Sequence, residues 1–195
     1  MQPSGSDPTA FDRLHPKIQR WIRAQGWSEL RDIQDLAIGA LIDKGGDVLI
    51  SAATAAGKTE AAFLPILTRS ALASETALTV LYVSPLKALI NDQFRRLDLL
   101  CEQMEIPVVR WHGDAPQGPK QRLIKQPRGI ALITPESIEA LLVRRPGDAR
   151  RLFAGLEVVV IDELHAFLQG PRSMHLASLL NRIDLLTGRR AQRVG

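Results

Sequence analysis

The chain has 195 residues, which is enough for one substantial domain with a buried core. Hydrophobic residues make up 45% of it and charged residues 24%, and these ordinary globular values exclude wholesale disorder. The formal net charge of +4 is compatible with a nucleic-acid partner, although many domains without one carry a similar excess.

The first ten residues are rich in Pro, Ser and Gly. They lack the apolar centre of a signal peptide, so we expect a flexible, solvated lead-in over residues 1–10. The apolar runs Leu78–Val83 and Val158–Ile161 are much shorter than the ~20 residues of a membrane-spanning helix. No membrane partner is therefore expected.

The chain has one cysteine, Cys101, so it can form no intramolecular disulfide and complete no structural zinc site. Leucines at helical spacing surround this residue, which predicts a buried structural thiol. A reducing, cytoplasmic location is consistent with this cysteine usage.

Short β-branched runs alternate with longer helical patterns along the rest of the chain. The predicted strands are Asp47–Ser51, Thr79–Ser84, Pro107–Trp111, Gly129–Thr134 and Glu157–Asp162. Apolar residues at helical spacing predict helices over Leu36–Ile42, Ala61–Leu72, Leu86–Leu100, Ile138–Val143 and Leu176–Leu186. Strands joined through helices form right-handed crossovers, so we predict an α/β fold with a mainly parallel sheet and helices on both faces.

A polar cluster follows each predicted strand. The clusters are Ser51–Thr59, Ser84–Lys87, His112–Asp114, Thr134–Glu136 and Asp162–His165. Ligands of parallel sheets bind beyond the carboxyl ends of the strands, so one extended functional rim is expected there. Loops at strand ends are often polar without a function, so the residue types in each cluster must show whether it could bind a ligand.

The strongest cluster is Ala52–Thr59, Ala-Ala-Thr-Ala-Ala-Gly-Lys-Thr, between a predicted strand and a predicted helix. Small residues let the backbone curl around phosphates, while a helix N-terminus and a cation neutralise them. Lys58 is expected to reach the β- and γ-phosphates, and the Thr59 hydroxyl to ligate Mg²⁺. The general pattern has Gly where this chain has Ala52, and the alternative is an ordinary helix-start loop. The expected nucleotide contacts are Ala53, Thr54, Ala55, Ala56, Gly57, Lys58 and Thr59.

An acidic pair ends the buried hydrophobic strand Val158–Ile161. Asp162 is expected to hold Mg²⁺, and Glu163 to orient and deprotonate the attacking water. Two adjacent acids can also be a solvated turn, but together with Lys58 and Thr59 they predict an ATP–Mg²⁺ site.

Asp162-Glu163-Leu164-His165 completes a DExH box, and from Phe11 to Arg190 the chain resembles the first RecA-like domain of a superfamily 2 helicase. Three further segments match that superfamily in order and spacing. They are Ser84–Leu89 (motif Ia), His112–Asp114 (the glycine motif) and Thr134–Ser137 (motif Ib), alongside Ala52–Thr59 as motif I. Ala55–Pro65 and Trp111–Asp114 look most like the large helicase-related (Lhr) group, with the Ski2-like DExH helicases as close competitors.

The resemblance implies a RecA-like P-loop NTPase domain over residues 11–195 and ATP-driven 3′→5′ translocation on DNA or RNA. It assigns His165 to coupling between the γ-phosphate site and the inter-domain cleft; a buried structural histidine is the alternative. It assigns Gln34 to adenine, with Phe11 or Trp27 as the stacking aromatic. Related proteins usually have Pro where this chain has Asp32, which puts base specificity in doubt. Helix packing is an equal alternative for Trp21 and Trp27.

A translocating enzyme holds the strand through its phosphates rather than its bases. The resemblance places contacts to single-stranded DNA or RNA at Pro85, Lys87, Gly113, Thr134 and Pro135. A solvated helix face is expected for Arg95, Arg96, Lys120, Arg122 and Lys125. The pairs Arg144-Arg145 and Arg150-Arg151 flank a predicted Pro-Gly-Asp turn.

Motif III and the second RecA-like domain, which carries the arginine fingers, are expected to be absent from this chain. We therefore expect a monomer that binds ATP–Mg²⁺ and hydrolyses it poorly. Two alternatives stay open. A nucleotide or small-molecule kinase would need a lid and an acceptor pocket, and no Arg-rich lid insertion is present. A non-catalytic, helicase-derived nucleic-acid-binding module would keep the fold without cycling ATP, although intact Lys58, Thr59, Asp162 and Glu163 argue against decay of the site.

Overall fold

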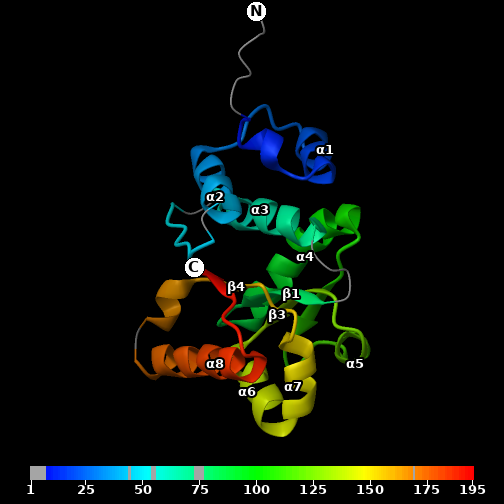
Figure 1. Cartoon of the computed structure of the whole chain (residues 1–195), viewed down its shortest axis with the longest axis vertical. Coiled ribbons are helices and arrows are strands. Elements are labelled where there is room, and N and C mark those ends of the chain that lie inside the picture. Colours follow the sequence, from blue (N-terminus) through cyan, green and yellow to red (C-terminus); the bar gives the residue numbers. More distant parts are fainter. Residues whose placement is uncertain (1–7, 44, 54–55, 73–76, 169) are drawn as a thin grey trace, which may run out of the picture.

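A computed structural model of the chain describes residues 8–43, 45–53, 56–72, 77–168 and 170–195 (Figure 1). The helices are α1 (Pro16–Ala24), α2 (Asp32–Asp43), α3 (Lys58–Leu72), α4 (Lys87–Met104), α5 (Gln117–Lys125), α6 (Pro135–Arg144), α7 (Pro146–Phe153) and α8 (Pro171–Thr187). Two short 3-10 helices, η1 (Phe11–Arg13) and η2 (Leu164–Phe167), complete the helical part.

The sheet has five parallel strands in the order β2-β3-β1-β4-β5. Their bounds are β1 (Leu78–Val83), β2 (Val108–Trp111), β3 (Gly129–Ile133), β4 (Val158–Ile161) and β5 (Gln192–Val194). The predicted α/β fold with a parallel sheet is confirmed, and four predicted strands match β1 to β4 closely.

Helices cover both faces of this sheet, α1 to α4 on one side and α6 to α8 on the other (Figure 1). Side chains alternate between the faces: Val80 and Tyr82 of β1 join the core under α2, α3 and α4, whereas Leu81 and Val83 join the core under α6, α7 and α8. Every residue of β1 is buried, as expected for a central strand covered on both sides.

The expected strand Asp47–Ser51 is only partly formed. Val48 makes an isolated parallel bridge to Val194, and the amide of Ile50 donates to the Gly195 carbonyl at 2.7 Å. The pairing partner β5 was not predicted, because its three residues carry too weak a pattern to indicate a strand by themselves.

Two further expectations are wrong. The predicted Pro-Gly-Asp turn is the first turn of α7, because proline suits the first helical position. Lys120 does not lie on a solvated face but is buried on α5.

The expectation for Cys101 is confirmed. The thiol is buried on α4, and burial raises its pKa to about 12. Among the residues that the structure describes, no helix combines the length and the apolar character needed to cross a bilayer.

Candidate nucleotide site and nucleic-acid rim

The predicted phosphate loop connects the extended segment at Val48–Ile50 to the start of α3 at Lys58. The first intrahelical bond runs from the Ala61 amide to the Gly57 carbonyl, at 2.9 Å. The amides of the first turn therefore have no helical acceptor and remain available to an anion. Two of the residues expected in this loop, Thr54 and Ala55, lie outside the described part of the chain.

Gly57 has φ of +85°, a conformation that favours glycine. A Cβ at this position would lie 2.8 Å from Nε2 of Gln34. Gln34 is 1% exposed, and its Oε1 accepts a 3.0 Å bond from the Arg31 amide. The side chain expected at adenine is thus packed against the phosphate loop.

The Lys58 side chain is exposed and curls back over the loop. Its Nζ donates to the Ala52 carbonyl at 2.8 Å, and the Ala56 amide bonds to the Ala53 carbonyl at 3.2 Å. The ammonium group therefore lies at the loop itself. Thr59, next along the chain, is half-buried in the first turn of α3.

Asp162 follows β4 directly, at the carboxyl edge of the sheet. Its amide donates to the Val83 carbonyl at 2.9 Å, and its Oδ2 accepts a 3.4 Å bond from the Ser84 hydroxyl. Burial, together with the charge of Asp162, raises the pKa of the Tyr82 hydroxyl, which keeps that group neutral. The end of β1 and the end of β4 are thereby joined through side chains at the acidic pair.

Glu163 has a left-handed backbone, with φ 49° and ψ 47°. Among the described residues only Glu105 is a second non-glycine with positive φ, and it ends α4, where this conformation is common. Glu163 instead lies between a strand and a 3-10 helix. A non-glycine residue in this region costs of order 1–3 kcal/mol, and such strain concentrates at functional sites.

The His165 side chain is 78% exposed, so the alternative of a buried structural histidine is wrong. Its Nδ1 lies 3.2 Å from Oε2 of Glu163. The second acid of the pair and the histidine of the DExH box are therefore in direct contact.

A polar network holds the glycine motif after β2. Oδ1 of Asn91 accepts from Arg110 at 2.9 Å and lies 3.2 Å from Nε2 of His112. Burial lowers the pKa of His112, which favours the neutral ring, and its Nε2 faces an oxygen that only accepts. Nζ of Lys120 donates to the His112 carbonyl at 2.7 Å, which explains why this lysine is buried.

Lys87 and the glycine motif meet on the surface. Nζ of Lys87 is 2.8 Å from Oδ2 of Asp114, and a Cβ on Gly113 would be 3.6 Å from the same Nζ. The hydrogen bond from Lys87 lowers the pKa of Asp114. Two of the residues predicted to hold nucleic acid, Lys87 and Gly113, are thus neighbours, and the lysine is paired with an acidic side chain.

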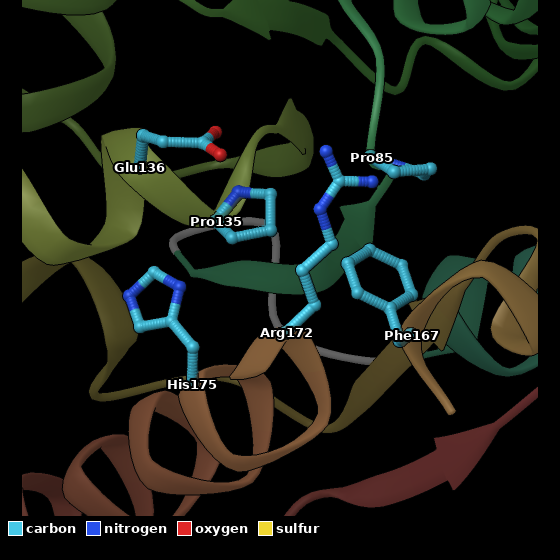
Figure 2. Close-up of a pocket in the computed structure, with 6 residues that line it drawn as sticks. All are labelled: Pro85, Pro135, Glu136, Phe167, Arg172 and His175. Atoms are coloured by element: carbon cyan, nitrogen blue, oxygen red, sulfur yellow. The ribbon is translucent and has the colours of Figure 1, made fainter. Parts of the chain in front are cut away.

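Thr134 caps α6: its hydroxyl oxygen accepts from the Ser137 amide at 3.4 Å, and Pro135 takes the first helical position. Pro135 and Pro85 lie on one small pocket at the carboxyl edge of the sheet (Figure 2). The pocket is lined by Pro85, Pro135, Glu136, Phe167, Arg172 and His175.

Sequence reasoning missed the last three of these residues. Arg172 and His175 are three positions apart on α8, so they share one helix face. Pro171 was the available signal, because a proline soon after the DExH box marks the start of a helix.

A larger cleft lies at the N-terminal helices and includes Phe11, Arg23 and Trp27 in its lining. The Arg23 guanidinium lies 5.2 Å from the centre of the Phe11 ring, and Trp21 and Trp27 pack edge to face at 5.5 Å. Trp21 and Trp27 therefore pack against each other, whereas stacking of Phe11 or Trp27 on a base stays a prediction.

Within the described ranges, no three His, Cys, Asp or Glu side chains converge as metal ligands. The Mg²⁺ sites of nucleotide enzymes need no such cluster, because one or two side chains and the phosphates share the ion. The oxygens of Thr59 and Asp162 are ligands of the kind that Mg²⁺ prefers.

Residues 31–195 match the family model of the DEAD/DEAH box helicases. The chain belongs to this family.

Its relatives include Lhr helicases. The chain is 34% identical over 191 residues to the ATP-dependent helicase Lhr-Core of Methanothermobacter thermautotrophicus, a match that covers 90% of the chain and 22% of the relative. It is 36% identical over 169 residues to the Lhr helicase/uracil glycosylase of Escherichia coli, covering 75% of the chain and 11% of the relative. The chain thus spans only a fraction of the length of these relatives.

Solved structures agree with the fold. Mycobacterium smegmatis helicase Lhr bound to ssDNA and AMP-PNP is similar with a TM-score of 0.83 and 32% identity, over 96% of this chain and 25% of that chain. The DEAD-box helicase Mss116 bound to ssRNA and UDP-BeF gives a TM-score of 0.82 at 16% identity, over 100% of this chain and 42% of that chain. The RecA-like helicase fold is therefore present here.

Proposed function

We propose that residues 11–195 form the ATP-binding lobe of an Lhr-type helicase, which binds ATP–Mg²⁺ and one strand of DNA or RNA at the carboxyl edge of its sheet. One observation carries this proposal. The segment that leads into the phosphate loop bonds to β5 through Val48 and Ile50, and β5 pairs with β4, whose carboxyl end carries Asp162 and Glu163.

In the proposed reaction, water attacks the γ-phosphorus, the bond to ADP breaks, and Glu163 accepts the proton of the water. Lys58 would leave the Ala52 carbonyl and neutralise the β- and γ-phosphates. Thr59 and Asp162 would hold Mg²⁺, whose positive charge would stabilise the negative charge on the phosphate oxygens. His165 contacts Glu163 and would couple the γ-phosphate site to the cleft between this domain and a second one.

Gln34, Gly57 and the loop residues Ala53, Thr54, Ala55 and Ala56 complete the proposed nucleotide site. Because the buried Gln34 amide packs on Gly57, we assign it to aligning the loop as well as to the base. Phe11 and Trp27, which line the N-terminal cleft, are the stacking surface of this proposal.

The strand would be held by Pro85, Lys87, Gly113, Thr134 and Pro135, on the loops at the carboxyl edge. The M. smegmatis Lhr structure, which contains ssDNA and AMP-PNP, supports both halves of the proposal. The buried, unpaired Cys101 supports a cytoplasmic setting.

Nucleotide binding tests the proposal directly. A fluorescent ATP analogue with Mg²⁺ should bind the chain, and Lys58→Ala should abolish binding. Lys125→Ala removes the same charge from an exposed position on α5 and should bind as the unchanged chain does. Equal binding by all three would contradict the proposed site.

A further inference from the structure

The pocket between the motif Ia and motif Ib loops contains a cation to which the family resemblance assigns no role. We propose that Arg172, at the start of α8, is an additional phosphate contact for the bound strand. This inference rests on the proposed function of the rim, and it extends the binding surface from the two loops to a third element.

Figure 2 shows the guanidinium of Arg172 extending between Pro85 and Pro135, with the Phe167 ring beside its stem. Phe167 is 3% exposed, so this wall of the pocket is part of the core and does not move freely. The side chain therefore emerges at the place where the two proposed strand-binding loops face each other.

The two prolines create a need for a donor at this place. Proline has no N–H, so neither Pro85 nor Pro135 can donate a backbone hydrogen bond to a phosphate. A guanidinium supplies planar, two-pronged donation to phosphate oxygens and keeps its charge at any working pH. Arg172 thus offers there the donors that these two prolines lack.

The local electrostatics show that the folded chain alone does not explain this cation. Arg172 lies in the first turn of α8, where the helix dipole disfavours a positive charge. That turn contains no acidic residue, and no ion pair found among the described residues includes Arg172. Glu139 on α6, which contacts α8, is already bonded to His175 and Arg182.

By contrast, three arginines elsewhere on this side of the sheet are paired with aspartates. Arg145 and Arg151 both bond to Asp148, and Arg193 bonds to Asp184. Arg172 forms no ion pair found among the described residues and lies at a helix end that disfavours its charge. An anionic ligand would provide the opposite charge.

Glu136 lines the same pocket and is exposed. Its charge opposes a phosphate there, so it restricts the path of the strand to the Arg172 side of the pocket. The ligand class is therefore a single-stranded phosphodiester backbone, read through charge and not through bases.

The experiment measures binding of a fluorescent oligothymidylate to the chain by anisotropy, from about 50 to 200 mM salt. Arg172→Gln should bind about 3- to 10-fold more weakly. It should also reduce the slope of log K against log salt by about 0.7, the value for one phosphate on a single strand. Glu136→Gln should bind more tightly, a gain that misfolding cannot produce.

Arg150→Gln is the matched control, since it removes an exposed arginine from α7, away from the pocket. It should leave affinity and slope unchanged. Lys87→Ala reports on the rim itself. If Lys87→Ala weakens binding and Arg172→Gln does not, the role of Arg172 is refuted while the proposed function stands. If the unchanged chain shows no salt-dependent binding, the proposed function fails and this inference falls with it.

Discussion

The left-handed backbone at Glu163 turns the chain sharply at the end of β4, between the Asp162 carboxylate and the His165 ring. An extended or helical Glu163 would carry its carboxylate elsewhere. The strain is consistent with a side chain whose direction matters more than local stability.

Glu163→Gln should therefore keep the shape of the site and lose its base. We expect unchanged binding of an ATP analogue and a turnover about 10²–10⁴-fold lower, the usual worth of general-base catalysis. Phosphate release measures this. Glu157→Gln, at the opposite end of β4, is the control and should turn over normally. Normal turnover by Glu163→Gln would show that another group accepts the proton.

The contact between Lys87 and Asp114 makes a second prediction at this scale. The Asp114 carboxylate pairs with the Lys87 ammonium group, which would otherwise be available to a phosphate. Both side chains of the pair are exposed. Asp114→Asn should tighten binding of single-stranded DNA about 2- to 5-fold, because exposed pairs are worth up to about 1 kcal/mol. Anisotropy measures the change, with Asp98→Asn on α4 as a control for net charge. Weaker binding would mean that Asp114 positions Lys87 and does not compete for it.

Individual side chains were predictable where a motif fixes them to a strand end. Ser84, Asp162 and Glu163 lie at the carboxyl edge because their strands end there. Burial of Lys120 was not predictable, since its acceptor is a backbone carbonyl of His112 that only the tertiary fold brings near.

Among the elements, β5 has a larger role than its three residues suggest. It pairs with β4 on one side and with the segment leading into the phosphate loop on the other. Asp47 strengthens this edge: its Oδ1 accepts from the Arg193 amide at 2.9 Å, and its carboxylate pairs with Arg190.

Asp47→Ala should consequently weaken the pairing between β5 and the segment that leads into the phosphate loop. Loss of about 1 kcal/mol would lower the melting temperature by about 2–4 °C, and ATP-analogue binding should weaken in parallel. Thermal unfolding and nucleotide titration measure the two effects. Asp148→Ala, which removes an aspartate with two arginine partners on α7, should change stability without changing nucleotide affinity.

At this scale the sequence predicted strands with continuous β-branched runs, such as β4, and helices with long apolar patterns. It did not indicate α1, α7 or β5, and it placed Lys120, Arg122 and Lys125 on a helix without predicting the bounds of α5. These are short elements, and what stabilises them is contact with neighbouring helices and strands rather than their own propensity.

At the scale of the whole molecule, the chain spans 22% of an archaeal Lhr-Core relative and 11% of the E. coli one. We propose that full activity needs a second RecA-like domain that supplies arginine to the γ-phosphate. Such arginines are worth on the order of 10³–10⁵ in rate.

The chain by itself should thus bind ATP–Mg²⁺ and turn it over at least about 10³-fold more slowly than an Lhr-Core enzyme with both domains. ATPase assays with and without single-stranded DNA and RNA measure this difference. Rapid, strand-stimulated turnover by residues 1–195 would refute the proposal.

The close approach of Gly57 to the Gln34 amide has a mechanical consequence. The gap between α2 and the phosphate loop does not accommodate even one methyl carbon, since that carbon would be 2.8 Å from Nε2. A shift of α2 toward the loop must therefore displace the loop as well. A ligand at the N-terminal helices and a ligand at the phosphates would then be coupled through the side chains of Gln34 and Arg31, which both lie against Gly57.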